Sequence, residues 1–217
     1  MMRIVRFAIL CAGLLAVGAS AQNAAGQSTT LRPEQAAGEW SFSASAYTYI
    51  VPNSHDYVQP TITADRRWLH LEARYNYEDQ ETASAWVGYN FSFGEKLSLD
   101  LTPMLGGVFG NTTGIAPGLR GSLKWSRLEL YGEGEYVFNT RERADSFFYL
   151  WSELTVSPAN WLRAGLVAQR TRAYETERDI QRGFLVGLSY KKVEIAGHVF
   201  NPDLSKPTYV ISVRVEF

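Results

Sequence analysis

Charged side chains recur at every second position in several extended segments of this sequence. The densest run is Glu129, Glu133 and Glu135, with Tyr131 between them. Alternate residues of a strand share one face. Rows of carboxylates and guanidinium groups on one face can line an aqueous passage and select solutes by charge and size. The same rows can also pair with each other and fill the space between strands. The residues that could do either are Glu72, Arg74, Asp100, Arg120, Lys124, Glu129, Glu133, Glu135, Glu153, Arg163, Glu194, His198 and Arg214.

Nucleophilic and metal chemistry have weaker signals. Ser54, His55 and Asp56 have the residue types of a hydrolytic triad. However, three adjacent loop residues point in different directions, so we interpret them as a polar loop and expect no catalytic residues. His70 and His198 are expected to hydrogen-bond to carboxylates. The three histidines are scattered and the only cysteine is Cys11, so the sequence predicts no metal site and no cofactor.

The elements that position these residues are segments of alternating polarity separated by turns. We count twelve, of about ten residues each, a pattern typical of a transmembrane barrel. They span residues 40–51, 57–64, 68–77, 83–93, 97–109, 115–125, 128–139, 147–156, 161–171, 181–190, 193–200 and 209–217.

The connections between these segments alternate in length. Those after odd segments are longer and polar, and those after even segments are tighter, with turns expected at 65–67, 94–96, 126–127, 157–160 and 191–192. This is the asymmetry between external loops and periplasmic turns. Apolar residues flank the two-residue turns, as at Trp125 and Leu128, so the alternation keeps its phase. The pattern predicts an all-β, antiparallel, up-and-down barrel of about 12 strands, with 10 as the alternative.

The other face of each segment is apolar, and its aromatic residues gather near the strand ends. Two aromatic belts suit the two interfaces of a bilayer. The aromatic residues expected to face lipid are Tyr77, Phe109, Phe138, Phe148, Phe184 and Tyr209 at the outer rim and Phe93, Trp125, Tyr190 and Phe217 at the inner rim. A soluble sandwich or lipocalin-like barrel is the structural alternative.

The last segment carries the clearest family signal. Tyr209, Ile211, Val213, Val215 and Phe217 alternate with polar or charged residues, and the chain ends on an aromatic residue. This segment resembles the terminal strand of bacterial outer-membrane β-barrel proteins. The resemblance implies a Gram-negative outer-membrane location and contact with lipid and lipopolysaccharide. It also implies recognition of the carboxyl-terminal aromatic residue by the barrel assembly machinery. The alternation of long loops and tight turns predicts that both termini lie in the periplasm.

The amino-terminal region reads as a targeting segment. Arg3 and Arg6, an apolar run and a small-residue site ending at Ala21 predict a signal peptide over 1–21. Residues 22–39 are expected to form a flexible periplasmic leader, and 40–217 the barrel. The chain has 21 Lys and Arg against 22 Asp and Glu, which excludes the basic balance of a nucleic-acid-binding protein.

Two functions fit this sequence. The first is a narrow passive channel for small polar or charged solutes. The second is a structural or accessory barrel whose lumen is closed by salt bridges. A lipid-modifying enzyme is a third, weaker alternative. No protein-facing strip stands out, so we expect a monomer.

Overall fold

The computed structural model describes residues 38–52, 54–170 and 180–217. The predicted signal peptide and most of the predicted leader lie outside these residues. The strands are β1 (Ser41–Ile50), β2 (Tyr57–Arg66), β3 (Leu69–Tyr75), β4 (Thr82–Tyr89), β5 (Phe91–Phe93), β6 (Leu97–Gly110), β7 (Gly114–Trp125), β8 (Leu128–Asn139), β9 (Phe147–Ala159), β10 (Leu162–Arg170), β11 (Gln181–Tyr190), β12 (Val193–Phe200) and β13 (Thr208–Glu216). A short 3₁₀ helix, η1 (Arg143–Asp145), lies between β8 and β9.

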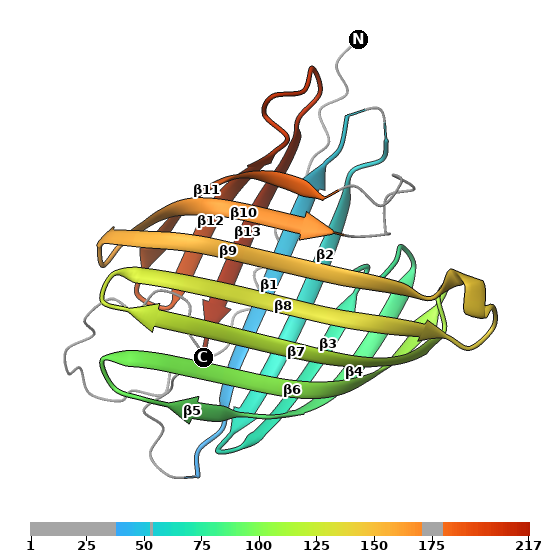
Figure 1. Ribbon diagram of the computed structural model, residues 1–217, viewed down its shortest axis with the longest axis horizontal. Coiled ribbons are helices and arrows are strands. Elements are labelled where there is room, and N and C mark those ends of the chain that lie inside the picture. The colour runs from blue at the N-terminus through green and yellow to red at the C-terminus, as the bar shows by residue number, and fades with distance from the viewer. Residues whose placement is uncertain (1–37, 53, 171–179) are drawn as a thin grey trace, which may run out of the picture.

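These strands form one closed antiparallel barrel (Figure 1). Except for β4 and β5, which both pair with β6, each strand pairs with the next, and β1 pairs with β13. Because β4 and β5 follow one another along β6 and act as one interrupted strand, the barrel has twelve strands in effect, which confirms the predicted number. The two ends of the barrel sequence meet, because Ser43 lies opposite Glu216 and the Phe217 amide donates to the Phe42 carbonyl at 2.9 Å.

The interruption between β4 and β5 has a local cause. The register places Tyr89, the last residue of β4, opposite Pro103 of β6, which has no amide hydrogen for the ladder, and it places Asn90 opposite Thr102. The Asn90 side chain instead donates to Asp65 at 2.8 Å and accepts from Thr102 at 2.7 Å. The single segment predicted over 83–93 is therefore split in two.

Two turns are tighter than the sequence suggested. Strand β2 continues to Arg66 and β9 continues to Ala159, so the turns expected at 65–67 and 157–160 shrink to two residues each. Arg67, Ser126 and Lys191 begin turns of this kind with φ of 56°, 56° and 54°. A positive φ at this position matches the twist of a two-residue hairpin.

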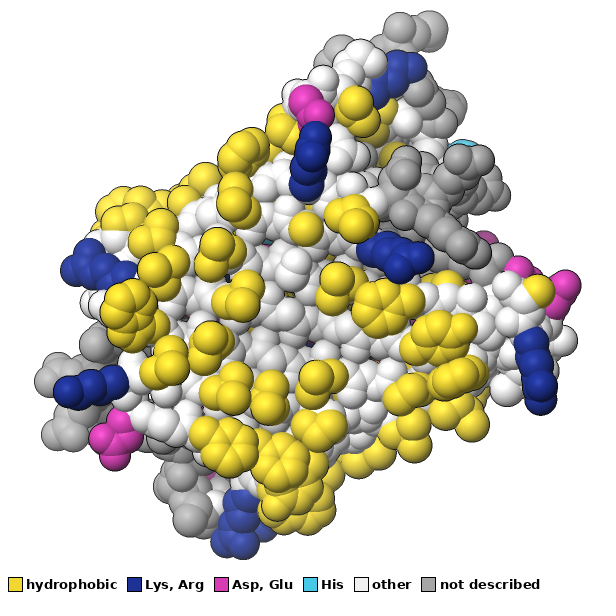
Figure 2. All heavy atoms as spheres, in the orientation of Figure 1, with side chains coloured by type: hydrophobic (Ala, Val, Ile, Leu, Met, Phe, Trp, Pro, Cys, Tyr) yellow, Lys and Arg dark blue, Asp and Glu magenta, His cyan; other side chains and the backbone are white. Residues whose placement is uncertain are grey.

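The outside of the barrel is apolar. Strand β4 shows strict alternation, with Ala83, Ala85, Val87 and Tyr89 exposed and the residues between them buried. Nine of the ten aromatic residues predicted to face outward are exposed. Figure 2 shows hydrophobic side chains spread over one face of the wall, with most charged side chains toward the strand ends. In the described part of the chain, no helix is long and apolar enough to cross a membrane.

The buried residues lie inside the barrel. One apolar cluster is built around Tyr49, Tyr149, Trp151 and Phe200, and a second around Trp86. These aromatic residues share the interior with buried charged residues of β3, β7, β8, β9 and β10. The lumen is therefore a packed space in which apolar and ionic groups meet.

Candidate functional site in the barrel lumen

All thirteen predicted lumen residues point into the barrel. Ten of them are buried, and Lys124, Glu194 and Arg214 are half-buried. Burial inside a closed sheet means that each side chain faces the lumen, because the opposite face of the same strand is exposed. Whether these residues line an open pore stays a prediction.

Five of these residues form a cross-lumen ion cluster, which we define as Glu72, Arg74, Arg120, Glu133 and Glu135. From β3, Arg74 reaches Glu133 on β8 at 2.7 Å and Glu135 at 2.8 Å, and it contacts Glu72 at 2.5 Å. On β7, Arg120 lies 3.3 Å from Glu133 and also contacts Glu72 on β3. Strands β3 and β8 are not neighbours in the sheet. The cluster therefore bridges the lumen from wall to wall.

Hydroxyl and imidazole groups extend the cluster. Tyr77 and Tyr131 donate to the two oxygens of Glu133 at 2.9 and 2.7 Å. The ring nitrogens of His70 lie 2.8 Å from Asp65 and 2.9 Å from Glu72. Two carboxylate partners suit the imidazolium, since both of its nitrogens donate. The expectation that His70 binds carboxylates is confirmed.

The local pairing of charges follows from strand register. Arg120 lies opposite Glu133 and Lys124 lies opposite Glu129 in the β7–β8 ladder. The Lys124–Glu129 separation is 4.0 Å. The predicted acidic row on β8 and the basic row on β7 are therefore neighbours rather than opposing walls, and they pair with each other.

A second cluster lies on β9, β10 and β12, formed by Glu153, Arg163, Glu194 and His198. Arg163 contacts Glu153 at 2.6 Å and Glu194 at 2.8 Å. The Nε2 atom of His198 lies 3.5 Å from Glu153 but makes no aligned hydrogen bond, so the prediction that His198 hydrogen-bonds to a carboxylate is wrong. Asp100, the remaining predicted acid, accepts a hydrogen bond from Ser92 at 2.6 Å.

Sequence reasoning missed the aromatic residues that share the lumen with these ions. Tyr49 donates to Gln169 across the lumen at 3.2 Å, and Trp151 donates to Glu153 at 3.0 Å. On β1, Tyr47 and Tyr49 alternate with Ala46 and Thr48, so the strand has no strongly polar face to identify the lumen side. The signal available was the alternation itself, which places Ser43, Ser45, Tyr47 and Tyr49 on one face.

The position predicted for Tyr77 is wrong. Tyr77 was expected on the lipid face at the outer rim, but its hydroxyl binds Glu133 inside the barrel. Strand β3 ends at Tyr75, and Asn76 has a left-handed φ of 56°. This residue breaks the alternation, so the next side chain turns inward.

Glu78 sits beyond the end of β3 and is fully buried. Ser84 donates to one of its oxygens at 2.5 Å, and Arg74 lies 3.8 Å away. Burial raises the pKa of the Glu78 carboxyl above its usual value, against the opposing effects of Arg74 and Ser84. Its other oxygen has no hydrogen-bond partner among the described residues.

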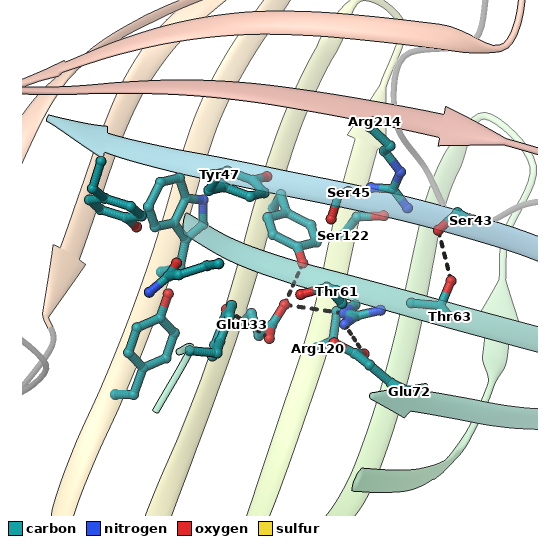
Figure 3. Close-up of a pocket in the computed structure, with 16 residues that line it drawn as sticks. Ser43, Ser45, Tyr47, Thr61, Thr63, Glu72, Arg120, Ser122, Glu133 and Arg214 are labelled. Atoms are coloured by element: carbon teal, nitrogen blue, oxygen red, sulfur yellow. Dashed lines mark hydrogen bonds and ion pairs between the residues drawn. The ribbon is translucent and has the colours of Figure 1, made fainter. Parts of the chain in front are cut away.

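A cavity of about 70 Å³ remains between the clusters, large enough to hold water (Figure 3). Serine, threonine, tyrosine and glutamine side chains of β1 and β2 border one side, and ionic, polar and aromatic side chains of β7, β8 and β9 border the other. The lining residues are Ser43, Ser45, Tyr47, Tyr49, Gln59, Thr61, Thr63, Glu72, Tyr77, Arg120, Ser122, Tyr131, Glu133, Tyr149, Trp151 and Arg214.

The triad-like sequence lies outside this site. Ser54, His55 and Asp56 are exposed in the β1–β2 loop. Asp56 accepts a hydrogen bond from the Val51 amide at 3.2 Å, so its carboxylate is engaged by backbone. Across the described ranges, no group of three or more His, Cys, Asp or Glu side chains has the geometry to hold a metal ion.

Comparison with known proteins gives a structural likeness without a close sequence relative. No family model and no curated protein matches the sequence. A solved KdgM porin is 12% identical, with a TM-score of 0.56, covering 81% of this chain and 99% of the porin. A KdgM porin in complex with disordered oligogalacturonate is also 12% identical, with a TM-score of 0.53, covering 82% and 99%. At this identity the likeness shows a shared porin-like barrel fold.

Proposed function

We propose that this chain is an outer-membrane barrel that acts as a narrow passive channel for small polar or charged solutes. The observation that carries the proposal is the course of the lumen cavity. It touches four successive inward positions of β1, from Ser43 to Tyr49. Six residue steps cover about 20 Å along a strand. At the usual barrel tilt this is about 15 Å along the axis, more than half of an apolar band about 25 Å tall.

The exterior supports a membrane location. Large apolar side chains cover the wall, and the exposed aromatic residues lie near the strand ends. In lipid, a closed barrel satisfies every backbone group that an open sheet would leave unpaired. The porin-like fold and the terminal Phe217 support the outer membrane, with export by the signal peptide, both termini in the periplasm and insertion by the assembly machinery. Lipid and lipopolysaccharide would contact the wall, and we propose that the barrel is a monomer.

The lumen limits the solutes to small ones. The cross-lumen ion cluster and the aromatic residues around Tyr149 and Trp151 make the path narrower than the lumen of an unfilled twelve-stranded barrel. One compared porin is in complex with disordered oligogalacturonate, whereas the thirteen predicted lumen residues here include seven carboxylates and five Lys or Arg. We therefore propose compact polar solutes for this lumen in place of oligogalacturonate.

The alternative is a structural or accessory barrel with a closed lumen. The observation in its favour is that Arg74, Arg120 and Arg163 are all held in close ion pairs. A lumen filled in this way would stiffen the barrel for an envelope partner without passing solutes.

Solute uptake into proteoliposomes separates the two functions. With neutral and charged solutes graded in size, the channel predicts swelling with a low size limit. Tyr149→Ala should raise that limit, because Tyr149 lines the cavity. Phe148→Ala is the matched control, since Phe148 is the adjacent aromatic on the lipid face. No swelling for wild-type protein that is shown to be folded would leave the closed barrel.

A further inference from the structure

One basic group in the lumen is not used by the ion clusters. The Nε atom of Arg214 is buried and has no hydrogen-bond partner among the described residues. In the same part of the chain, no carboxylate lies within the 4.0 Å ion-pair distance of its guanidinium. Arg74, Arg120, Lys124 and Arg163 all have carboxylate partners. Arg214 thus differs from the other described lumen cations.

The acidic residue opposite Arg214 in the sheet already has other partners. Glu194 lies opposite Arg214 in the β12–β13 ladder. One oxygen of Glu194 accepts from Arg163 at 2.8 and 3.2 Å, and the other accepts from Ser189 at 3.2 Å. The Glu194 carboxylate is therefore directed to β10 and β11, and Arg214 keeps its charge available.

Hydroxyl groups surround the same space. Ser45 lies opposite Arg214 in the β1–β13 ladder, and both line the lumen cavity. Ser122, on β7, borders the cavity from the other side; it is 2% exposed, and its hydroxyl has no hydrogen-bond partner in the described residues. Figure 3 shows the Arg214 side chain directed toward the space that Ser45 and Ser122 border.

We propose that Arg214, with Ser45 and Ser122, forms a binding site for a small oxyanion, the carboxylate or phosphate group of a solute. A guanidinium presents two parallel N–H donors that match the oxygens of either group. The serine hydroxyls supply further donors, and the unpaired Arg214 and Ser122 atoms would gain the partners that buried polar groups require. The cavity size restricts the ligand to a compact solute.

This inference rests on the proposed channel and adds a preference for one sign of solute charge. A solute anion would pause at Arg214, while the paired ions of the cross-lumen cluster offer it no free cation. The site therefore favours small anionic solutes over cations of similar size, although carboxylates outnumber basic residues in the lumen as a whole.

The test is equilibrium binding of inorganic phosphate to the refolded protein in detergent micelles, by titration calorimetry at constant ionic strength. Arg214→Gln should weaken phosphate binding by about tenfold or more, the loss expected for a charge-assisted hydrogen bond. Ser122→Ala removes a hydroxyl without a charge and should weaken binding by about two- to tenfold. Arg182→Gln is the control, because Arg182 pairs with Asp203 on the exposed outer surface.

Unchanged affinity in the folded Arg214→Gln and Ser122→Ala variants, or no phosphate binding to wild-type protein, would overturn the site. Conductance in planar bilayers tests the channel separately. A silent bilayer with Arg214-dependent phosphate binding refutes the channel and supports the site. Ion conductance without phosphate binding does the reverse.

Discussion

Replacing Arg74 with Met should destabilise the barrel strongly, because Arg74 is the cation shared by most of the cross-lumen ion cluster. Its guanidinium lies 2.5 Å from Glu72, 2.7 Å from Glu133 and 2.8 Å from Glu135, and its side chain is fully buried. It also stacks 4.2 Å from the Tyr77 ring centre and 4.6 Å from that of Trp86.

The magnitude follows from the charges left behind. In the Met variant, Arg120 is the only arginine left in the cluster, where it contacts Glu72 and Glu133, and Glu135 loses its cation. Breaking a buried pair by removing one partner costs about 3–5 kcal/mol, because the remaining charge is uncompensated. Met has a similar length, so lost packing adds little. We therefore expect the free energy of unfolding to fall by about 3–5 kcal/mol.

The assay is guanidinium chloride unfolding of the protein in phospholipid vesicles, followed by tryptophan fluorescence and heat-modified gel mobility. Adding Glu135→Gln to Arg74→Met should restore part of the loss, since it removes one of the uncompensated charges. Arg182→Met, at an exposed pair, is the control and should change nothing measurable. A loss below about 1 kcal/mol for Arg74→Met, the range of exposed pairs, would refute the reasoning.

Three further predictions concern packing, pH and assembly. Gly106→Ala should lower the free energy of unfolding by about 1–3 kcal/mol, because the new Cβ would lie 2.5 Å from the Trp86 ring. Gly132→Ala is the control and should be neutral in the same unfolding assay, because no atom lies within 4 Å of its new Cβ. The pKa of Glu78 is raised in the folded state, so the folded protein holds this proton more tightly than the unfolded chain does. The contribution of Glu78 to the free energy of unfolding is therefore fully present below the ordinary glutamate pKa of about 4.3, and it is lost as pH rises through the higher folded pKa. Glu78→Gln should flatten the pH dependence of the unfolding midpoint in that window, and an unchanged profile would contradict this. Deleting Phe217, a residue that is 66% exposed, should leave in vitro stability nearly unchanged but reduce the folded fraction in outer membranes. Equal assembly would contradict the proposed recognition of Phe217 by the assembly machinery.

Period-two alternation was enough to predict the barrel, the number of strands and which face of most strands lines the lumen. Residues 128–139, 181–190 and 193–200 form strands with the predicted bounds, because tight turns and clear alternation define their ends. Alternation also placed Glu72, Glu133 and Arg163 inside, since charge on the lipid face is costly.

What alternation cannot give is the contact between strands far apart in the sequence. Arg74 and Glu135 are 61 residues apart and meet across the lumen, a result of barrel closure and side-chain reach that a single segment does not encode. The inward turn of Tyr77 depends on the left-handed Asn76, and the break at Asn90 depends on Pro103 in the partner strand. The distinction between a pore lining and an ion-pair network therefore required the structure.

The central claim is that solutes pass through this lumen, and single-channel recording in planar bilayers tests it most directly. Refolded protein should give small, discrete conductance steps. Glu133→Gln with Glu135→Gln should change their size and ion selectivity, because both carboxylates belong to the cross-lumen ion cluster. Bilayers that stay silent with protein shown to be folded would contradict the channel and leave the closed barrel as the function.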